Sequence, residues 1–95
     1  MRIQCEDRPR AGQQFMFRVT GATGKTRIEA HVDTRRVLET ECPDPPCHEM
    51  VQIPAQTRDS ILRLIAIDSI GNREELEFII ADSEAGAGGV MVTTS

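Results

Sequence analysis

Apolar and polar residues alternate with a period of two through most of this 95-residue chain. Successive side chains of a β-strand point to opposite faces, so this alternation predicts strands with one face in a core. Between residues 62 and 67 both parities are apolar, which predicts a strand with Leu62, Leu64 and Ala66 inward. The inward positions of the three clearest alternating runs are Phe15, Phe17 and Val19; Ile28, Ala30 and Val32; and Leu76, Phe78 and Ile80.

Turn-forming residues separate these runs at short, regular intervals, and three further segments have strand composition. These segments are Arg2–Glu6, Val37–Glu41 and His48–Ile53. About seven short strands with this spacing predict an all-β fold, a two-sheet antiparallel sandwich. A helix over Arg27–Glu41 is the alternative, but no helical register places its apolar residues on one stripe.

The composition changes after residue 83. Residues 84–95 hold a Gly-rich stretch followed by Val90-Met91-Val92-Thr93, which again has strand composition. We therefore expect one domain over residues 1–83 and a flexible linker and tail over 84–95. The tail segment Val90, Met91 and Val92 could form an extra strand, in its own domain or on the sheet edge of a neighbour.

Composition limits the function classes. A chain of 95 residues forms one small domain, and its net charge of −4 argues against nucleic-acid binding, which needs a basic face. There is no Trp or Tyr and there are three Phe, so stacking platforms for bases or sugars are scarce. The apolar runs are too short for membrane insertion.

The three cysteines indicate the kind of cellular compartment in which the protein works. Cys42 and Cys47 enclose a four-residue loop with three prolines. If the flanking strands are antiparallel partners, opposed Cα atoms lie ~4.5–5.5 Å apart, within the range of a disulfide. We predict a Cys42–Cys47 disulfide, which implies an oxidising compartment. Cys5 is then expected to be a buried free thiol, with an intermolecular bridge as the alternative.

The first seven residues lack the charged and apolar regions of a signal peptide. This leaves a cytosolic protein, a mature secreted protein or a domain cut from a longer chain.

Between residues 12 and 82, several short motifs occur in the same order as in a known family. Val32-Asp33, Val37, Cys42 and Pro46-Cys47 are followed by Ala-x-Asp-x-x-Gly-Asn at Ala66, Asp68, Gly71 and Asn72. This stretch resembles the bacterial immunoglobulin-like domains of cell-surface and secreted proteins. The resemblance implies a seven-stranded sandwich that serves as a spacer or contact module without chemistry of its own.

The chain departs from that family pattern at several places. Thr34 stands where a glycine often follows the aspartate, and the loop after Val19 lacks a frequent aspartate. The aromatic residues that often follow the cysteine loop are replaced by His48, Glu49 and Met50.

Two motifs point weakly to other chemistry. Gly21–Thr26 is similar to a phosphate loop, but the first required glycine would fall at Val19, so a glycine-rich hairpin turn is favoured. Cys42, Cys47 and His48, with Cys5 or His31, could hold zinc. Adjacent residues of a strand point to opposite faces, however, which favours the disulfide.

Aspartates in or beside turns raise the possibility of calcium binding at one end of the sandwich, although no Asp-x-Asp-x-Asp loop is present. Turn bracing by side-chain hydrogen bonds is the favoured role for Asp68, Asn72 and Asp33. The serines lack a nucleophile elbow and the histidines lack a nucleophile beside them, so no enzyme activity, no cofactor and no metal site are expected. The turn aspartates are Asp33, Asp44, Asp59, Asp68 and Asp82.

The outward apolar residues predict a contact face. Ile65 and Ile67 face outward if Leu64 faces inward, and Ile79 and Ala81 are expected beside them on the next strand. Cover by the folded-back tail is the alternative.

Together these features predict a non-catalytic structural or protein-interaction module, extracellular, cell-surface or periplasmic. We expect it to bind a protein partner or a neighbouring domain. The alternatives are a calcium- or glycan-binding accessory module, and a filament or capsid subunit that self-assembles by strand addition.

Overall fold

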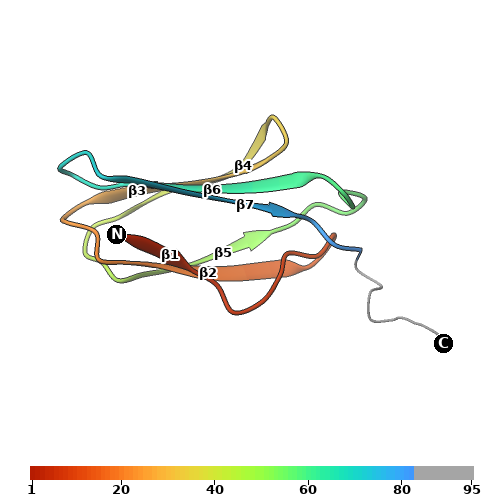
Figure 1. Ribbon diagram of the computed structural model, residues 1–95, viewed down its shortest axis with the longest axis horizontal. Coiled ribbons are helices and arrows are strands. Elements are labelled where there is room, and N and C mark those ends of the chain that lie inside the picture. Colours follow the sequence, from red (N-terminus) through yellow and green to blue (C-terminus); the bar gives the residue numbers. More distant parts are fainter. Residues whose placement is uncertain (83–95) are drawn as a thin grey trace.

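The computed structural model describes residues 1–82, which form seven strands in two antiparallel sheets packed face to face (Figure 1). The predicted all-β two-sheet sandwich is confirmed. The predicted linker and tail strand lie outside the described residues. The strands are β1 (Arg2–Gln4), β2 (Gln14–Thr20), β3 (Thr26–Val32), β4 (Arg35–Cys42), β5 (Cys47–Gln52), β6 (Ile61–Ile67) and β7 (Arg73–Ile79).

The three-stranded sheet has the order β1-β2-β5 and the four-stranded sheet has the order β4-β3-β6-β7. Three connections therefore join neighbours within one sheet, and the other three, β2–β3, β4–β5 and β5–β6, pass between the sheets. The prediction that Gly21–Thr26 forms a hairpin turn is wrong, because this segment is the β2–β3 crossover. Gly24 is required there, since its φ is +72° and a Cβ atom would lie 2.6 Å from Ser69 Oγ.

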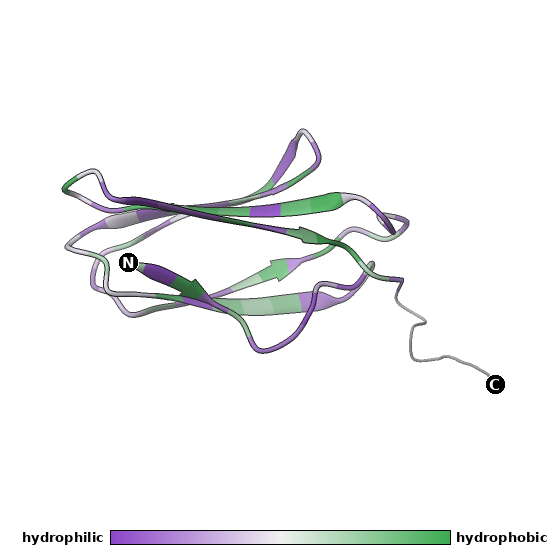
Figure 2. Cartoon of the chain, viewed as in Figure 1, coloured by the Kyte–Doolittle hydropathy of each residue, from purple (hydrophilic) through white to green (hydrophobic). Residues whose placement is uncertain are grey.

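The core lies between the two sheets. It consists mainly of the residues that the alternation predicts to point inward. Ile28, Leu62 and Leu64 are fully buried, and burial of such a side chain contributes about 1.5–3 kcal/mol. Figure 2 shows β6 as hydrophobic apart from one hydrophilic band, and its sequence holds one charged residue. Its inward face is entirely apolar, and its outward face combines three isoleucines with Arg63.

The first strand is shorter than predicted, because β1 ends at Gln4 and pairs only with Arg18–Thr20 of β2. The chain then leaves this sheet, and Arg10 forms a parallel bridge with Ala81 next to the other sheet. Pro9 lacks an N–H group and takes part through its carbonyl, which accepts a hydrogen bond from Ala81 N at 2.9 Å. The first segment is therefore divided between the two sheets.

The Cys42–Cys47 disulfide is present, with the two Cα atoms 6.1 Å apart. The geometry from which it was predicted is wrong, because β4 and β5 belong to different sheets and do not pair. Cys42 lies opposite Thr26 of β3, and Cys47 lies opposite Val19 of β2. The proline loop thus crosses between the sheets, and the bond ties one sheet to the other.

Loss of this bond should destabilise the domain. We expect Cys42→Ala with Cys47→Ala, or reduction of the wild type, to cost about 2 kcal/mol, which corresponds to a Tm about 10 °C lower. Thermal unfolding followed by circular dichroism measures the effect, and Cys5→Ala, which keeps the bond, is the control. An unchanged Tm after complete reduction would contradict an inter-sheet stabilising role.

Candidate interaction surface

The outer face of the four-stranded sheet is covered by opposite charges on neighbouring strands. Arg27 on β3 forms ion pairs with Glu29 and with Glu39 of β4. Arg63 on β6 contacts Glu75 and Glu77 of β7, with nitrogen–oxygen distances of 3.1 and 3.0 Å. Such exposed pairs contribute little stability individually. They do make this face polar, and most of its charges are compensated by opposite charges on the same face.

The predicted contact face of Ile65, Ile67, Ile79 and Ala81 is not contiguous. Ile65 and Ile67 do face outward, but they are half-buried within the charged ladder. Ile67 lies between Arg27 and Arg73, and Ile65 lies between Glu29 and Glu75.

Ile79 is 62% exposed, but it lies opposite Ile61, at the other end of β6. Ala81 lies beside Arg10 and is half-buried. The prediction that these side chains point away from the core holds for the three isoleucines. The positions at which their strands pair differ from those expected, so the four residues do not form one patch.

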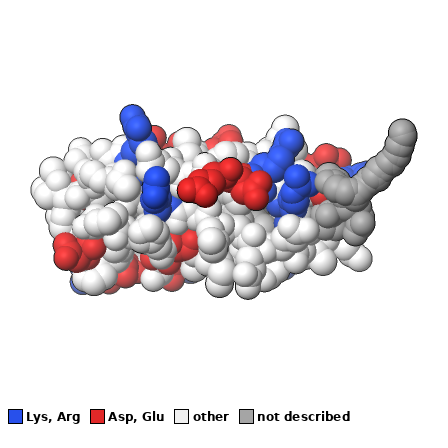
Figure 3. Space-filling model, turned by 90° about the horizontal axis from the view of Figure 1, so that it is seen from below, with Lys and Arg blue, Asp and Glu red and all other residues white. Residues whose placement is uncertain are grey.

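The outer face of the three-stranded sheet has a different character. Met16 of β2 and Met50 of β5 lie directly opposite each other and are 67% and 49% exposed. Gln14 and Gln52 form the adjacent pair on the same face. In Figure 3, which views this side of the molecule, much of the surface carries neither acidic nor basic residues.

Sequence analysis did not identify the two methionines as surface residues of interest. The signal was available, because Met16 has the outward parity between Phe15 and Phe17. Pairing with Met50 could not be foreseen, since it depends on the register between β2 and β5.

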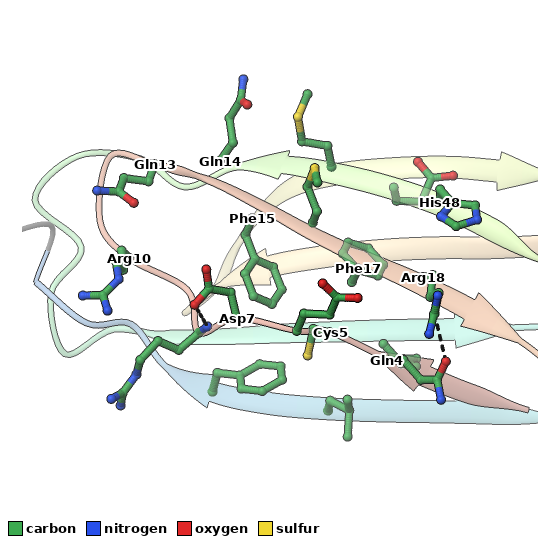
Figure 4. A pocket seen from close by; sticks show the side chains of 18 residues that line it. Gln4, Cys5, Asp7, Arg10, Gln13, Gln14, Phe15, Phe17, Arg18 and His48 are labelled. Carbon is green, nitrogen blue, oxygen red and sulfur yellow. Dashed lines mark hydrogen bonds between the residues drawn. The ribbon is translucent and has the colours of Figure 1, made fainter.

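A groove of about 1050 Å³ borders this face and wraps around the edge of β2 that β1 leaves uncovered. Figure 4 shows Cys5 and Asp7, from the segment after β1, on one side of it and Phe15 and Phe17 of β2 beside them. Leu76 and Phe78 of β7, half-buried residues of the inward parity, complete its apolar lining.

Among residues 1–82, no strand pairs with the groove side of the β2 backbone at two residues, Gln14 and Met16. Ile53 N donates to Gln13 O at 2.9 Å, which fixes the alternation of the antiparallel ladder between β2 and β5. Phe15 therefore bonds to β5, whereas Gln14 and Met16 direct their N–H and C=O groups to the opposite side. The β1–β2 ladder covers only Arg18–Thr20, so these groups face the groove.

The groove contains Cys5, which is a free thiol as predicted but is half-buried rather than buried. Burial raises the pKa of this thiol above its usual value. A neutral thiol is a poor nucleophile, so Cys5 is suited to packing rather than to reaction. Glu49 lies opposite Phe17 at the groove, and burial raises the pKa of its carboxyl group.

The turn aspartates form hydrogen bonds within the backbone scaffold. The Asp68 carboxylate accepts hydrogen bonds from Thr23 N, Ile70 N, Asn72 N and Asn72 Nδ2, at 2.8–3.2 Å. It thereby links the β6–β7 turn to the β2–β3 crossover. Burial acts to raise the pKa of Asp68, but these hydrogen bonds outweigh it and the pKa lies below its usual value.

Asp33 occupies the β3–β4 turn, with a φ of +55°, and its Oδ1 accepts a hydrogen bond from Ile61 N at 3.0 Å. This bond lowers the pKa of the Asp33 carboxyl. Ile61 begins β6 whereas Asp68 follows its end, so the two aspartates lie at opposite ends of that strand. Asp33 and Asp68 therefore do not share one end of the sandwich.

Within residues 1–82, no three His, Cys, Asp or Glu side chains are placed to hold a metal ion. Cys42 and Cys47 are bonded to each other, and His31 Nε2 lies 2.9 Å from Glu29 Oε1. His48 lies on the outer sheet face opposite Arg18. The residues considered for a zinc site are therefore not brought together.

The comparisons with known proteins add no identity. No protein-family model matches the chain, and neither the curated proteins nor the solved structures include a match. Residues 1–82 also contain no helix long and apolar enough to cross a membrane.

The Asp68 hydrogen bonds predict a pH-dependent contribution to stability. A carboxyl group with a lowered pKa in the folded state stabilises the fold above its unfolded pKa of about 3.9, and this is lost as the pH falls through the folded value. We expect Asp68→Asn to lower the Tm by several degrees at pH 7 and to reduce the loss of stability between about pH 5 and pH 2.

Urea unfolding across this pH range measures both effects. Asp44→Asn, at an exposed position in the proline loop, is the matched control. Parallel pH profiles for the wild type and Asp68→Asn would contradict the assigned role.

Proposed function

We propose that this chain is a non-catalytic, immunoglobulin-like module that works outside the cytoplasm as a spacer or contact domain. It docks a protein partner or a neighbouring domain through the outer face of its three-stranded sheet. The docking face is centred on Met16 and Met50.

The strand order supports the immunoglobulin-like assignment. In that fold the first, second and fifth strands share one sheet, and the third, sixth and seventh share the other. Here β1, β2 and β5 form one sheet, and β3, β6 and β7 form the other, with β4 added at the β3 edge. The family resemblance over residues 12–82 rests on motifs that lie at the ends of these strands and in the turns beside them, apart from Val37 within β4.

The disulfide supports a location outside the cytoplasm. Disulfides persist in secreted, periplasmic and cell-surface proteins, because cytosolic thiols are kept reduced. The Cys42–Cys47 bond ties the two sheets together, as suits a small domain with a limited core.

The contrast between the two outer sheet faces carries the docking proposal. Removing ion pairs from water is costly even when the pairs are kept, so a face covered by a ladder of ion pairs is a poor site for docking. Methionine is adaptable and is enriched at interfaces, whereas Lys and Glu are depleted there. The exposed Met16–Met50 pair, which lies between the Gln14–Gln52 pair and the Arg18–His48 pair, is the part of this face that meets these requirements.

Photo-crosslinking in the cell that makes the protein tests this surface. We expect a photoreactive residue at Gln52 to give a discrete crosslinked product, and one at Glu77, on the charged face, to give none. Met16→Glu with Met50→Glu should lower the yield from position 52 about tenfold, because docking would desolvate two charges.

Ile70→Glu is the matched control, because Ile70 is also 67% exposed but lies in the β6–β7 turn. Its yield should equal that of the wild type, and circular dichroism should show all variants folded. Equal yields from positions 52 and 77, or no product from either, would contradict the proposal.

A further inference from the structure

We propose that the chain's own segment Val90–Thr93 enters the groove and pairs as a short strand with the open edge of β2. Met16 and Met50 border both surfaces, but this pairing uses the free edge of the β2 backbone and the inward part of the groove lining, whereas partner docking uses the outward side chains.

The acceptor is the stretch Gln14–Phe17, where β2 pairs with β5 on one edge and, within residues 1–82, with no strand on the other. Gln14 and Met16 direct their N–H and C=O groups into the groove, and the ladder with β1 does not reach them. An unpaired strand edge of this kind is a template for another strand. The stretch has four residues, and Val90–Thr93 also has four.

The groove lining matches the side chains of that segment. Leu76 and Phe78 have inward parity but remain half-buried, and the Phe78 ring contacts the ring of Phe15, with centroids 5.8 Å apart. A paired strand points alternate side chains to one face, so Val90 and Val92 would cover this apolar lining. β-branched residues suit such a position, and Val90–Thr93 carries no side-chain charge into it.

The point at which the tail leaves the domain places it close to the groove. Ala81 bridges to Arg10, and Arg10 lines the groove. Val90 is eight residues beyond Asp82, so the connection can span up to about 28 Å, about twice the ~14 Å length of the acceptor stretch Gln14–Phe17. A connection as short as residues 83–89 gives an effective concentration of the order of millimolar. The chain's own tail therefore outcompetes the tail of a second copy at micromolar protein.

Amide hydrogen exchange measured by NMR tests the pairing directly. In the full chain, we expect exchange at Gln14 and Met16 to be at least about tenfold slower than in a chain carrying Val90→Asp and Val92→Asp. Charges at these positions would have to enter the apolar lining, which prevents the pairing. The amides of Phe15 and Phe17, bonded to β5, should stay protected in both chains and report that the sandwich is intact.

Thr94→Asp with Ser95→Asp adds the same charge outside the segment and is the matched control. It should retain the slow exchange at Gln14 and Met16. As a second readout, labelling of the Cys5 thiol should be several-fold slower in the wild type and in this control than in the Val90→Asp, Val92→Asp chain.

The outcomes separate the own-tail proposal from its alternatives. Slow exchange at Gln14 and Met16 that is independent of protein concentration, with a monomeric mass by light scattering, supports the own-tail strand. Slow exchange that appears only with a rising mass would show that a second copy supplies the strand, and this would overturn the proposal. Equal exchange in all three chains would overturn it as well. Crosslinking from position 52 tests partner docking separately, so failure of one proposal leaves the other standing.

Discussion

The packing of two apolar inner sheet faces against each other is the interaction on which the rest of this structure depends. It uses every second residue of the central strands, and it leaves the alternate residues free to differ between the two outer faces. On the four-stranded sheet these residues form a ladder of opposite charges around Arg27 and Arg63. On the three-stranded sheet they include the uncharged pair Met16 and Met50. The chemical difference between the faces can therefore serve recognition without a cost to the core.

Parity and local chemistry could be predicted from the sequence because they depend on neighbouring residues. The inward positions of β2, β3, β6 and β7 and the Cys42–Cys47 pairing follow from the alternation and from a loop too short to place the cysteines far apart. The sheet to which each strand belongs depends on contacts distant in sequence. That is why the Gly21–Thr26 crossover was expected to be a hairpin, and why the cysteine strands were expected to pair.

Register explains most of what sequence reasoning missed at the candidate surface. Ile79 has the predicted orientation, but the β6–β7 turn sets it opposite Ile61 rather than beside Ile65. Met16 and Met50 become one feature only through the β2–β5 ladder. The groove arises because the chain leaves β2 after Gln4, an event that the composition of Cys5–Arg8 does not signal.

The parallel bridge between Arg10 and Ala81 also has a mechanical consequence. Ala11 N donates to Ala81 O and Ala81 N donates to Pro9 O, so the first and last segments of the sandwich are joined side by side. Figure 1 shows β1 beginning at one end of the molecule and β7 running toward the other. Tension applied through Met1 and Asp82 would load these two hydrogen bonds together in shear, instead of opening them one after the other. A sandwich built this way resists extension at the point where its first and last segments pair.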